Sequence, residues 1–361
     1  MISISPAALK PALSDFDIAA LQAAFVTHGF NPRHAAPLLK AYYRSGGKVD
    51  FDALKLGRDL GRHIESEINF TQSKILERKV SADGTVKFLL GMQRGGAVEA
   101  VLMDAATPGR AAGCVSSQIG CAMGCDFCAS TRHGLERNLE SGEIVEQFLQ
   151  LRSAALASGR QLRTLVFMGM GEPLQNYDNV LAAIRRIGSN ELGELGWRQI
   201  TVSTVGIVPG IERLAEADVS VALALSLHAP DDETRHRIVP MNRRYSVAEI
   251  MDATRHYALK SGRIPNIEYC MLAEVNDSDA QARLLAERMK DFRAHVNLIP
   301  YNAIGAGLSG VEYRQPSFER LNAFMAILRG AGVAAHFRKT RGDDVNAACG
   351  QLRETAEGVK G

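Results

Sequence analysis

Short apolar segments alternate with amphipathic helices from Gly113 to Arg338, and this alternation is the feature that most constrains the fold. Strands that alternate with helices over a stretch this long predict βα units and a mostly parallel sheet. Six or seven such units favour an open, partial α/β barrel over a closed eight-fold one. The expected strands are Cys114–Ile119, Thr164–Met168, Ile200–Thr204, Ser220–Leu227, Asn266–Leu272, Val296–Pro300 and Val333–Arg338.

The chain on either side of this pattern has a different character. Residues 1–65 carry apolar residues at helical spacing without a strand signature, which predicts a small helical accessory domain that could bind RNA. Residues 66–110 contain alternating segments separated by glycines, which predicts a hairpin-rich connecting layer. We therefore expect the partial barrel to span 111–340 and a C-terminal segment to span 341–361.

The composition is typical of a soluble globular protein, with 46% hydrophobic and 23% charged residues. The longest apolar run, Val219–Leu227, has nine residues including two Ser, whereas a membrane-spanning helix needs about 20. The N-terminus lacks the basic start and apolar core of a secretion signal. We therefore expect a cytoplasmic protein without membrane contact, and a monomer because no long apolar or heptad surface is apparent.

The net charge does not decide whether the protein binds nucleic acid, and the number of cysteines does not decide their role. Both questions depend on local motifs. Lys and Arg number 42 against 40 Asp and Glu, so a net charge of +2 neither requires nor excludes a nucleic-acid partner. Six cysteines are too few for a disulfide scaffold in a chain of 361 residues. They are expected to be reduced and to serve as ligands, nucleophiles or core residues.

Polar residues follow four of the predicted strands, at Gly169–Pro173, Ser203–Thr204, Ser226–His228 and Pro300–Asn302. Loops are polar in general, so one such segment would mean little by itself. In a parallel barrel, however, the carboxyl ends of all strands meet on one rim, which is where the chemistry takes place. Four polar strand ends on one rim therefore predict a functional site there.

Three cysteines, Cys121, Cys125 and Cys128, have the spacing C-x3-C-x2-C. Three thiolates on a short loop can hold a soft metal centre. A closed structural zinc site would need a fourth ligand, which His133 could supply. An iron–sulfur cube held by three cysteines would instead leave one iron free to bind a substrate.

This spacing, with Phe127 before the last cysteine, resembles the signature of the radical S-adenosylmethionine (SAM) enzymes. In these enzymes the open iron of a [4Fe-4S] cluster binds SAM, and one electron cleaves SAM to methionine and a 5′-deoxyadenosyl radical. The chain from Val98 to Leu352 further resembles the dual-specificity RNA adenine C2-methyltransferases, which methylate an adenine in the peptidyl-transferase region of 23S rRNA and one beside the tRNA anticodon. The motifs that carry this resemblance are GCVSSQIGCAMGCDFCAS, FMGMGEPLQNYDNV, SLHAPDDETRHRIVPMN, NLIPYN and RKTRGDDVNAACGQL.

The resemblance implies cofactor-binding residues. Cys121, Cys125 and Cys128 match the cluster ligands, and Glu172 matches a carboxylate that pairs with the SAM amino group. The complete set implied to contact SAM is Gly171, Glu172, Ser203, Ser226, Leu227, His228 and Asn302.

The resemblance also implies three catalytic residues and two SAM molecules per turnover. Cys349 matches the cysteine that accepts a methyl group from a first SAM, because adenine C2 is too electron-poor to attack a sulfonium. A radical from the second SAM activates that methyl group, which adds to the adenine and leaves an enzyme–RNA thioether. Cys114 matches the cysteine that releases the product by forming a transient disulfide with Cys349. Glu99 matches the general base that removes the C2 proton.

Each of these three residues also has an ordinary structural interpretation. Cys349 beside two alanines, and Cys114 at a strand start, could be small core residues. Glu99 in an alternating strand could lie on a solvated face. Cys270 is expected in the core.

Basic residues cluster at Arg235–Arg237, Arg243–Arg244 and Arg338–Arg341. The resemblance implies that they lie near the mouth of the site, where they would contact RNA phosphates, and a solvated charged face is the alternative. The expected partners are 23S rRNA, tRNA and a reductase or flavodoxin-type electron donor.

Other functions stay open at this stage. The nearest is a C8-specific 23S rRNA adenine methyltransferase that confers antibiotic resistance, although RKTRGDD before AACGQL resembles the C2 enzymes. A non-catalytic RNA-binding protein with structural zinc would leave Cys349 unused. A different radical SAM reaction would leave the pair Cys114 and Cys349 unexplained.

Overall fold

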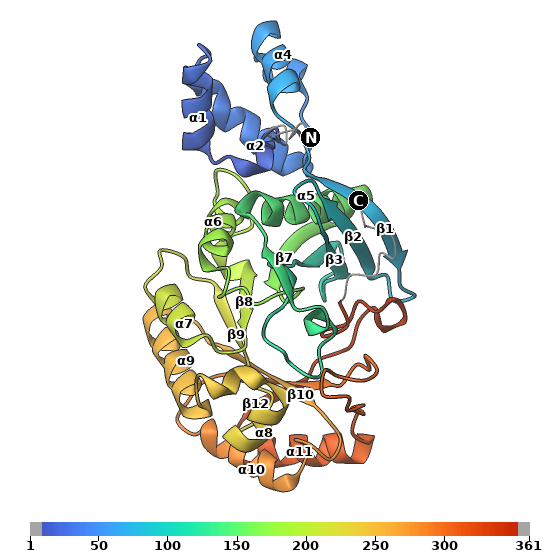
Figure 1. The fold of residues 1–361 in the computed structure, drawn as a ribbon. Coiled ribbons are helices and arrows are strands. Elements are labelled where there is room, and N and C mark those ends of the chain that lie inside the picture. The colour runs from blue at the N-terminus through green and yellow to red at the C-terminus, as the bar shows by residue number, and fades with distance from the viewer. Residues whose placement is uncertain (1–8, 353–361) are drawn as a thin grey trace, which may run out of the picture.

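The computed structural model describes residues 9–352, so 1–8 of the predicted helical domain and 353–361 of the predicted C-terminal segment lie outside it. Its body is a mixed sheet of ten strands surrounded by helices, and a further group of helices stands at one end (Figure 1). The strands of this sheet are β1 Ser73–Val80, β2 Val86–Met92, β3 Ala97–Asp104, β4 Arg110–Cys114, β7 Gln161–Phe167, β8 Ile200–Thr204, β9 Ala222–Ser226, β10 Asn266–Met271, β11 His295–Pro300 and β12 Ala334–Phe337.

Seven neighbouring strands of the sheet, β4 and β7 through β12, pair in parallel. Within the described residues β1 and β12 are the two edges of the sheet and do not pair with each other. The predicted open, partial α/β barrel is therefore confirmed. Its parallel strands bring their carboxyl ends to one rim.

The hairpin region continues the sheet of the barrel. Strands β1, β2 and β3 pair antiparallel in sequence order, and β3 then pairs antiparallel with β4. In this last pairing Val101 lies opposite Cys114, and Cys114 in turn lies opposite Val166 of β7. The hairpins are thereby hydrogen-bonded to the barrel.

One predicted strand, Cys114–Ile119, is wrong because it is divided. Strand β4 ends at Cys114, and β5 (Gln118–Gly120) pairs with β6 (Leu135–Asn138) in a separate two-strand sheet. Between them the Ser116 N–H donates to Gln147 Oε1 (2.8 Å) and the Ser117 N–H donates to the Met170 carbonyl (2.9 Å). These bonds direct the chain after Cys114 out of the large sheet, although the apolar residues of Cys114–Ile119 suggest one continuous strand.

The N-terminal residues are helical, as predicted. Asp17 caps the first helix by accepting from the Ala20 N–H (2.7 Å), which satisfies one of its free donors. Leu38 and Leu39 are fully buried in the hydrophobic cluster that also contains the sheet residues, so these helices share a core with the barrel. They are α1 Ile18–Thr27, α2 Ala35–Ser45, α3 Phe51–Leu54 and α4 Arg58–Glu67.

The barrel helices begin and end at conventional signals. In the capping box at the start of α9, the Ser246 N–H donates to Glu249 Oε2 (2.8 Å), and Gly262 ends the helix with a left-handed backbone. These helices are α5 Ser141–Ala157, α6 Tyr177–Gly188, α7 Val208–Ala215, α8 Asp232–Ile238, α9 Val247–Ser261, α10 Asp279–Arg288 and α11 Phe318–Gly330. Short 3₁₀ turns lie at Leu13–Asp15, Pro32–His34, Ala129–Thr131, Trp197–Gln199, Pro240–Arg243 and Asp343–Val345.

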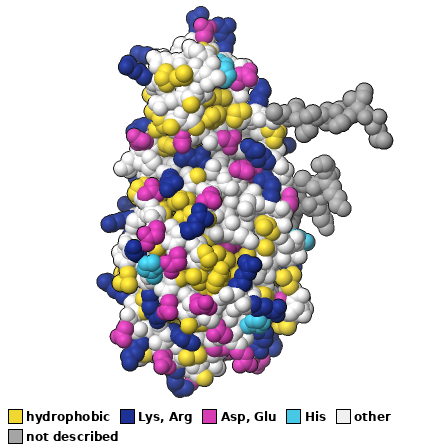
Figure 2. Space-filling model, turned by 60° about the vertical axis from the view of Figure 1, so that its left-hand side comes forward, with side chains coloured by type: hydrophobic (Ala, Val, Ile, Leu, Met, Phe, Trp, Pro, Cys, Tyr) yellow, Lys and Arg dark blue, Asp and Glu magenta, His cyan; other side chains and the backbone are white. Residues whose placement is uncertain are grey.

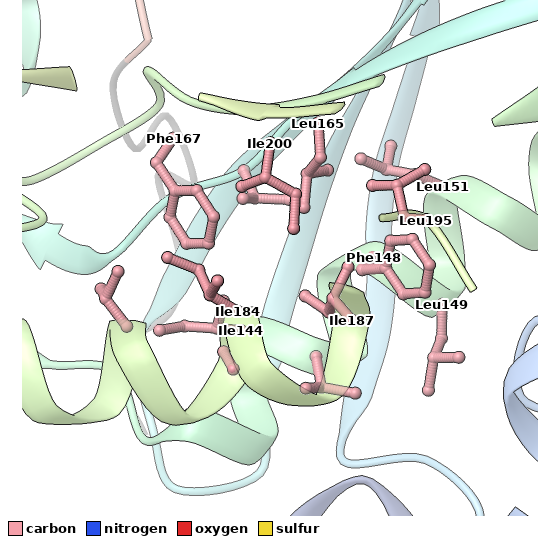
Figure 3. Close-up of a cluster of buried hydrophobic side chains, with 14 of the residues drawn as sticks. Ile144, Phe148, Leu149, Leu151, Leu165, Phe167, Ile184, Ile187, Leu195 and Ile200 are labelled. Atoms are coloured by element: carbon pink, nitrogen blue, oxygen red, sulfur yellow. The ribbon is translucent and has the colours of Figure 1, made fainter. Parts of the chain in front are cut away.

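Helices α5 and α6 close part of the barrel with a continuous apolar core. Ile144 and Phe148 of α5 and Ile184 of α6 point toward Leu165 of β7 and Ile200 of β8 (Figure 3). All five side chains are fully buried. Burial of apolar surface at about 25 cal/mol per Å² makes this layer a main source of stability for the parallel strands.

The surface carries charges of both signs. Lys, Arg, Asp and Glu side chains are interspersed over the face shown in Figure 2. No helix among residues 9–352 combines the length and apolar character that a membrane span would need.

Phe148→Ala should lower the free energy of unfolding by about 3 kcal/mol, because it leaves a cavity between α5 and the sheet. Leu156→Ala, on the exposed side of the same helix, is the matched control and should change stability by less than about 0.5 kcal/mol. Urea unfolding followed by far-UV circular dichroism measures both. Equal effects of the two substitutions would contradict the packing described here.

Candidate active site

A cavity opens at the carboxyl ends of the parallel strands. Its empty space, including the part open to solvent, is about 940 Å³. Consecutive strands supply its wall, with Phe167 from β7, Ser203 from β8, Ser226 from β9, Glu268 from β10 and Ile299 from β11. The rim on which the polar strand ends predict a site therefore carries a cavity.

Most of the predicted site residues line this cavity, but four do not. Leu227, Asn302, Cys114 and Glu99 are absent from its wall. The predicted residues that line it are Cys121, Cys125, Cys128, Gly171, Glu172, Ser203, Ser226, His228 and Cys349.

The three-cysteine loop runs between β5 and β6 and is held by its own backbone. The Cys121 N–H donates to the Gly134 carbonyl (2.8 Å) and the Cys128 N–H donates to the Cys125 carbonyl (3.0 Å). Gly120 precedes the loop with φ +72°, and a Cβ there would lie 2.0 Å from the Gly134 oxygen. Only glycine fits at this close approach, so the local sequence fixes where the loop turns.

The chemistry of these three thiols fits an iron–sulfur cluster. Burial raises the pKa of Cys121 to about 12 and also raises the pKa of Cys125 and Cys128, so ligation would displace protons. No group of three or more His, Cys, Asp or Glu within residues 9–352 is compact enough to hold a single metal ion. A cluster separates its ligands more widely than one ion does, because iron and sulfide fill the space between them. His133, the fourth ligand of the zinc alternative, is exposed and outside the cavity.

Glu172 is a buried carboxylate in the cavity wall. Its oxygens accept from the N–H groups of Leu174 (3.0 Å) and Val205 (2.9 Å). Burial nevertheless raises the pKa of Glu172 to about 7, because these bonds offset only part of the lost hydration. Gly171 before it has φ +95°, and a Cβ there would lie 2.5 Å from the Gln118 Cβ. The backbone turn that aims Glu172 therefore requires glycine.

His228 faces the cavity as a neutral ring. Its Nδ1 accepts from the Cys270 N–H (3.0 Å), which places the proton of the neutral ring on Nε2. Burial, followed by the positive charge of Arg235, lowers the pKa of His228 to about 3. The ring packs edge-on against Phe127, with ring centroids 4.8 Å apart. His228 is thus a fixed hydrogen-bond donor next to the cysteine loop.

The remaining predicted SAM contacts differ in position. The hydroxyls of Ser203 and Ser226 are 3.2 Å apart on the cavity wall. Leu227 is fully buried in a hydrophobic core cluster. Asn302 lies behind the wall, where its Nδ2 donates to the Cys349 carbonyl (3.2 Å). Asn302 therefore supports the C-terminal segment directly.

Cys349 is exposed and lines the cavity, so the interpretation of this residue as a small core residue is wrong. The segment that carries it is bound to the cysteine loop. The Ala129 N–H donates to the Gly350 carbonyl (2.8 Å), and the Ser130 hydroxyl donates to the Leu352 carbonyl (2.7 Å). These bonds bring a thiol from the C-terminal end of the chain to the edge of the three-cysteine loop.

Cys114 and Glu99 are both buried beside the cavity. Burial, followed by the effect of a negative charge on Cys349, raises the pKa of Cys114 to about 12. Cys114 and Cys349 are both free thiols in this structure. Glu99 forms an ion pair with Lys87 (2.7 Å), and the two side chains are 2% and 5% exposed. The interpretation of Glu99 as part of a solvated face is therefore wrong.

Comparisons with known proteins decide the family. Residues 115–285 match the family model of the radical SAM superfamily. A probable dual-specificity RNA methyltransferase, RlmN 1 of Opitutus terrae, is 48% identical over 96% of this chain and 97% of its own length. A probable dual-specificity RNA methyltransferase, RlmN of Symbiobacterium thermophilum, is 43% identical over 90% of this chain and 87% of its own.

The chain belongs to the RlmN family. The solved structure of a radical SAM methyltransferase from Sphaerobacter thermophilus superimposes with a TM-score of 0.89, at 41% identity, over 95% of this chain and 99% of that one. The protein is accordingly a radical SAM RNA methyltransferase, and its superfamily uses a [4Fe-4S] cluster and SAM. Cys121, Cys125 and Cys128 are the residues whose chemistry and place in the cavity fit that cluster.

One basic residue predicted to contact RNA has a different role in this RlmN relative. Arg235 is 1% exposed and bonds to the inside of the protein. Its Nε donates to the Leu227 carbonyl (2.9 Å), its Nη1 to Asn242 Oδ1 (2.9 Å), and its Nη2 to the Val205 carbonyl. A guanidinium used in this way braces the ends of β8 and β9. Its neighbour Arg237 is exposed.

Four further residues of the cavity wall were not predicted from the sequence to lie there. Glu268 accepts from Asn297 Nδ2 (2.9 Å) and from Arg338 Nη1 (3.2 Å). Arg338, predicted to be at the mouth, lies in the wall, where Cys349 and Glu268 raise the pKa of its guanidinium. Cys270 is buried as expected but also lines the cavity, as does Met168. Glu268 and Cys270 are two residues apart on β10 and therefore project from the same face of the strand. Which face lines the cavity could have been inferred only once the register of β10 was known.

Arg235→Met should lower the free energy of unfolding by about 3 kcal/mol, because it leaves the buried Val205 carbonyl without a donor and removes one of the two donors to the Leu227 carbonyl, which also accepts from the Ala229 N–H. Arg237→Met, the exposed neighbour, should change stability by less than about 0.5 kcal/mol. Thermal and urea unfolding of the two variants provide the comparison. An Arg235→Met protein that keeps normal stability but binds RNA weakly would show that the structural role assigned here is wrong.

Proposed function

We propose that this enzyme methylates C2 of an adenine in 23S rRNA and in tRNA, with Cys349 carrying the methyl group as a thioether before it reaches the base. The observation that carries the proposal is the exposed Cys349 thiol on the wall of the cavity that also holds Cys121, Cys125 and Cys128. The bound cluster and two molecules of SAM per turnover would supply the methyl group and a 5′-deoxyadenosyl radical.

The chain's own residues would hold SAM through complementary charge and hydrogen bonds. Glu172 would accept from the SAM amino group, and Gly171 beside it has no side chain to block the approach. Ser203, Ser226 and His228 present donors from the same wall. Leu227 and Asn302 would support the SAM site without lining the cavity. Leu227 is part of a buried hydrophobic cluster, and Asn302 donates to the Cys349 carbonyl.

Three residues would complete the transfer. The carbon radical formed on the Cys349 methyl group would add to adenine C2. Glu99 would take the C2 proton and one electron would return to the bound cluster, which leaves an RNA–Cys349 thioether. Cys114 then attacks the Cys349 sulfur, so that the methylated base leaves and a Cys114–Cys349 disulfide remains. The strand register supports the roles of Glu99 and Cys114 in one reaction, since Glu99, Val101 and Cys114 share one face of the sheet. Reduction of that disulfide by a cellular thiol would restore the enzyme.

The partners follow from the same chemistry. The exposed arginines Arg237, Arg243 and Arg244 could contact RNA phosphates, and residues 1–65 could extend the RNA-binding surface. Because Cys349 lies on the wall of the cavity, the target adenine must leave its stack to reach the sulfur. A reductase or flavodoxin-type protein would supply electrons in the cytoplasm, and the enzyme would act as a monomer.

The test is mass spectrometry of nucleosides from the RNA of a strain lacking this gene. 2-Methyladenosine should disappear from rRNA and tRNA in the deletion and return with the wild-type gene. It should stay absent with Cys349→Ala, which lacks the methyl-carrying sulfur. Cys114→Ala should instead accumulate protein covalently bound to RNA, since the thioether cannot be resolved.

Two other outcomes would contradict the proposal in different ways. Restoration of 8-methyladenosine by the wild-type gene would indicate a C8-specific enzyme that still uses Cys349. Zinc instead of iron and sulfide in the purified protein, without any change in the RNA, would favour a non-catalytic RNA-binding protein.

SAM affinity should rise about tenfold between about pH 6 and pH 8. Below its raised pKa of about 7, Glu172 is protonated and cannot pair with an ammonium group, and above it the carboxylate is ionised. Equilibrium dialysis of the cluster-loaded protein at several pH values measures the change. In Glu172→Gln the affinity should be low and this rise should vanish. An unchanged pH profile in that variant would remove Glu172 from the SAM site.

A further inference from the structure

Lys87 on β2 is a buried cation with two contacts that the mechanism above does not use. Its Nζ is 2.7 Å from Glu99 Oε1 and donates to the Asn346 carbonyl at 3.0 Å. Its side chain is only 5% exposed. Burying an ammonium costs several kcal/mol unless partners compensate it, so a chain that keeps Lys87 here depends on both contacts.

The strand register places Lys87 in the same row as the catalytic thiol. Lys87 lies opposite Val101 of β3, and Val101 lies opposite Cys114 of β4. Paired residues on neighbouring strands project from the same face of a sheet. Lys87, Glu99 and Cys114 therefore share one face of the sheet.

The hairpin that carries Lys87 also binds the segment that leads to Cys349. The Ser81 hydroxyl donates to Asp344 Oδ1 (2.5 Å), and the Gly342 N–H donates to Asp83 Oδ2 (3.2 Å). Gly342 has φ +65°, and a Cβ there would lie 2.8 Å from that of Ala347. Residues 342–346 are thus packed on the β1–β2 turn, and among these contacts that of Lys87 with the Asn346 carbonyl is nearest to Cys349 in sequence.

We propose that Lys87 is a positioning residue that couples the charge on Glu99 to the binding of the Cys349 segment, residues 342–349, to the β1–β2 hairpin. This inference rests on the roles given above to Glu99 and Cys349. While Glu99 is ionised, its carboxylate fixes the ammonium where it also binds the Asn346 carbonyl. Once Glu99 has taken the C2 proton, the ammonium loses its anionic partner and the segment loses a fixed contact. The segment is then loosened at the stage when Cys114 must reach the Cys349 sulfur.

Hydrogen–deuterium exchange of residues 342–349, measured by mass spectrometry on the full chain, tests the coupling. Lys87→Met should raise exchange of this segment about tenfold, and Glu99→Gln, which mimics the protonated carboxyl, should raise it by a similar factor. The double variant should exchange no faster than Lys87→Met. Lys79→Met is the matched control, because Lys79 lies opposite Lys87 on β1 but is only partly buried and pairs with Glu77 of its own strand, and it should leave exchange unchanged.

The catalytic readout is the deuterium isotope effect on RNA methylation with adenine deuterated at C2. In Lys87→Met, removal of the C2 proton should become slower and the isotope effect should increase, whereas methylation of Cys349 by SAM in the absence of RNA should still proceed. Lys87→Arg, which keeps a cation, should restore most of the wild-type rate. A merely structural lysine would lower both steps together and leave the isotope effect unchanged.

The outcomes separate this inference from the proposed function. If the wild-type enzyme makes no 2-methyladenosine, the proposed function fails whatever the exchange data show. If the wild type is active but Glu99→Gln leaves exchange of 342–349 unchanged, or its effect adds fully to that of Lys87→Met, the coupling through Lys87 is overturned. Should Lys87→Met not fold, Glu99→Gln and Lys87→Arg still decide between these results.

Discussion

The parallel pairing of β4 and β7 through β12 is the constraint on which the rest of the molecule depends. Each strand is fixed by its neighbours, so residues distant in sequence reach one rim with a defined spacing. Ser203 and Ser226 illustrate this, since they end neighbouring strands and their hydroxyls lie 3.2 Å apart. Strand β4 is the junction, because it is parallel to β7 on one side and antiparallel to β3 on the other. It thereby places Cys114 between the hairpins and the barrel.

Buried polar groups then turn the rim into a rigid site. Where the strands end, Arg235 donates to the Leu227 carbonyl and to the Val205 carbonyl, which would otherwise be unsatisfied. The Cys270 N–H fixes the ring of His228, and backbone N–H groups fix both oxygens of Glu172. Because these groups are already bound within the protein, a ligand meets donors and acceptors in fixed positions, with little ordering left to do on binding.

Local patterns gave reliable predictions where the physical cause was local. The predicted strands at Ile200–Thr204 and Val296–Pro300 follow from neighbouring apolar residues, and the structure agrees with them. The strand predicted at Cys114–Ile119 failed because side-chain and loop hydrogen bonds from distant residues redirect a chain that is apolar throughout. The prediction that Arg235 contacts RNA was wrong for a related reason. A basic residue in a basic cluster is expected to be exposed, and only the tertiary structure shows the carbonyls that it binds.

The sequence by itself determined the chemistry that the protein carries, because C-x3-C-x2-C, the GMGEP turn and the AACGQL segment are short, and their spacing limits what they can bind. Only the tertiary structure decided which of these groups meet. It brought Cys349 to the edge of the cysteine loop, buried Glu99 against Lys87 and turned Arg235 inward. The physical reason is that spacing along a chain fixes local geometry, whereas burial and ion pairing depend on which distant surfaces pack together.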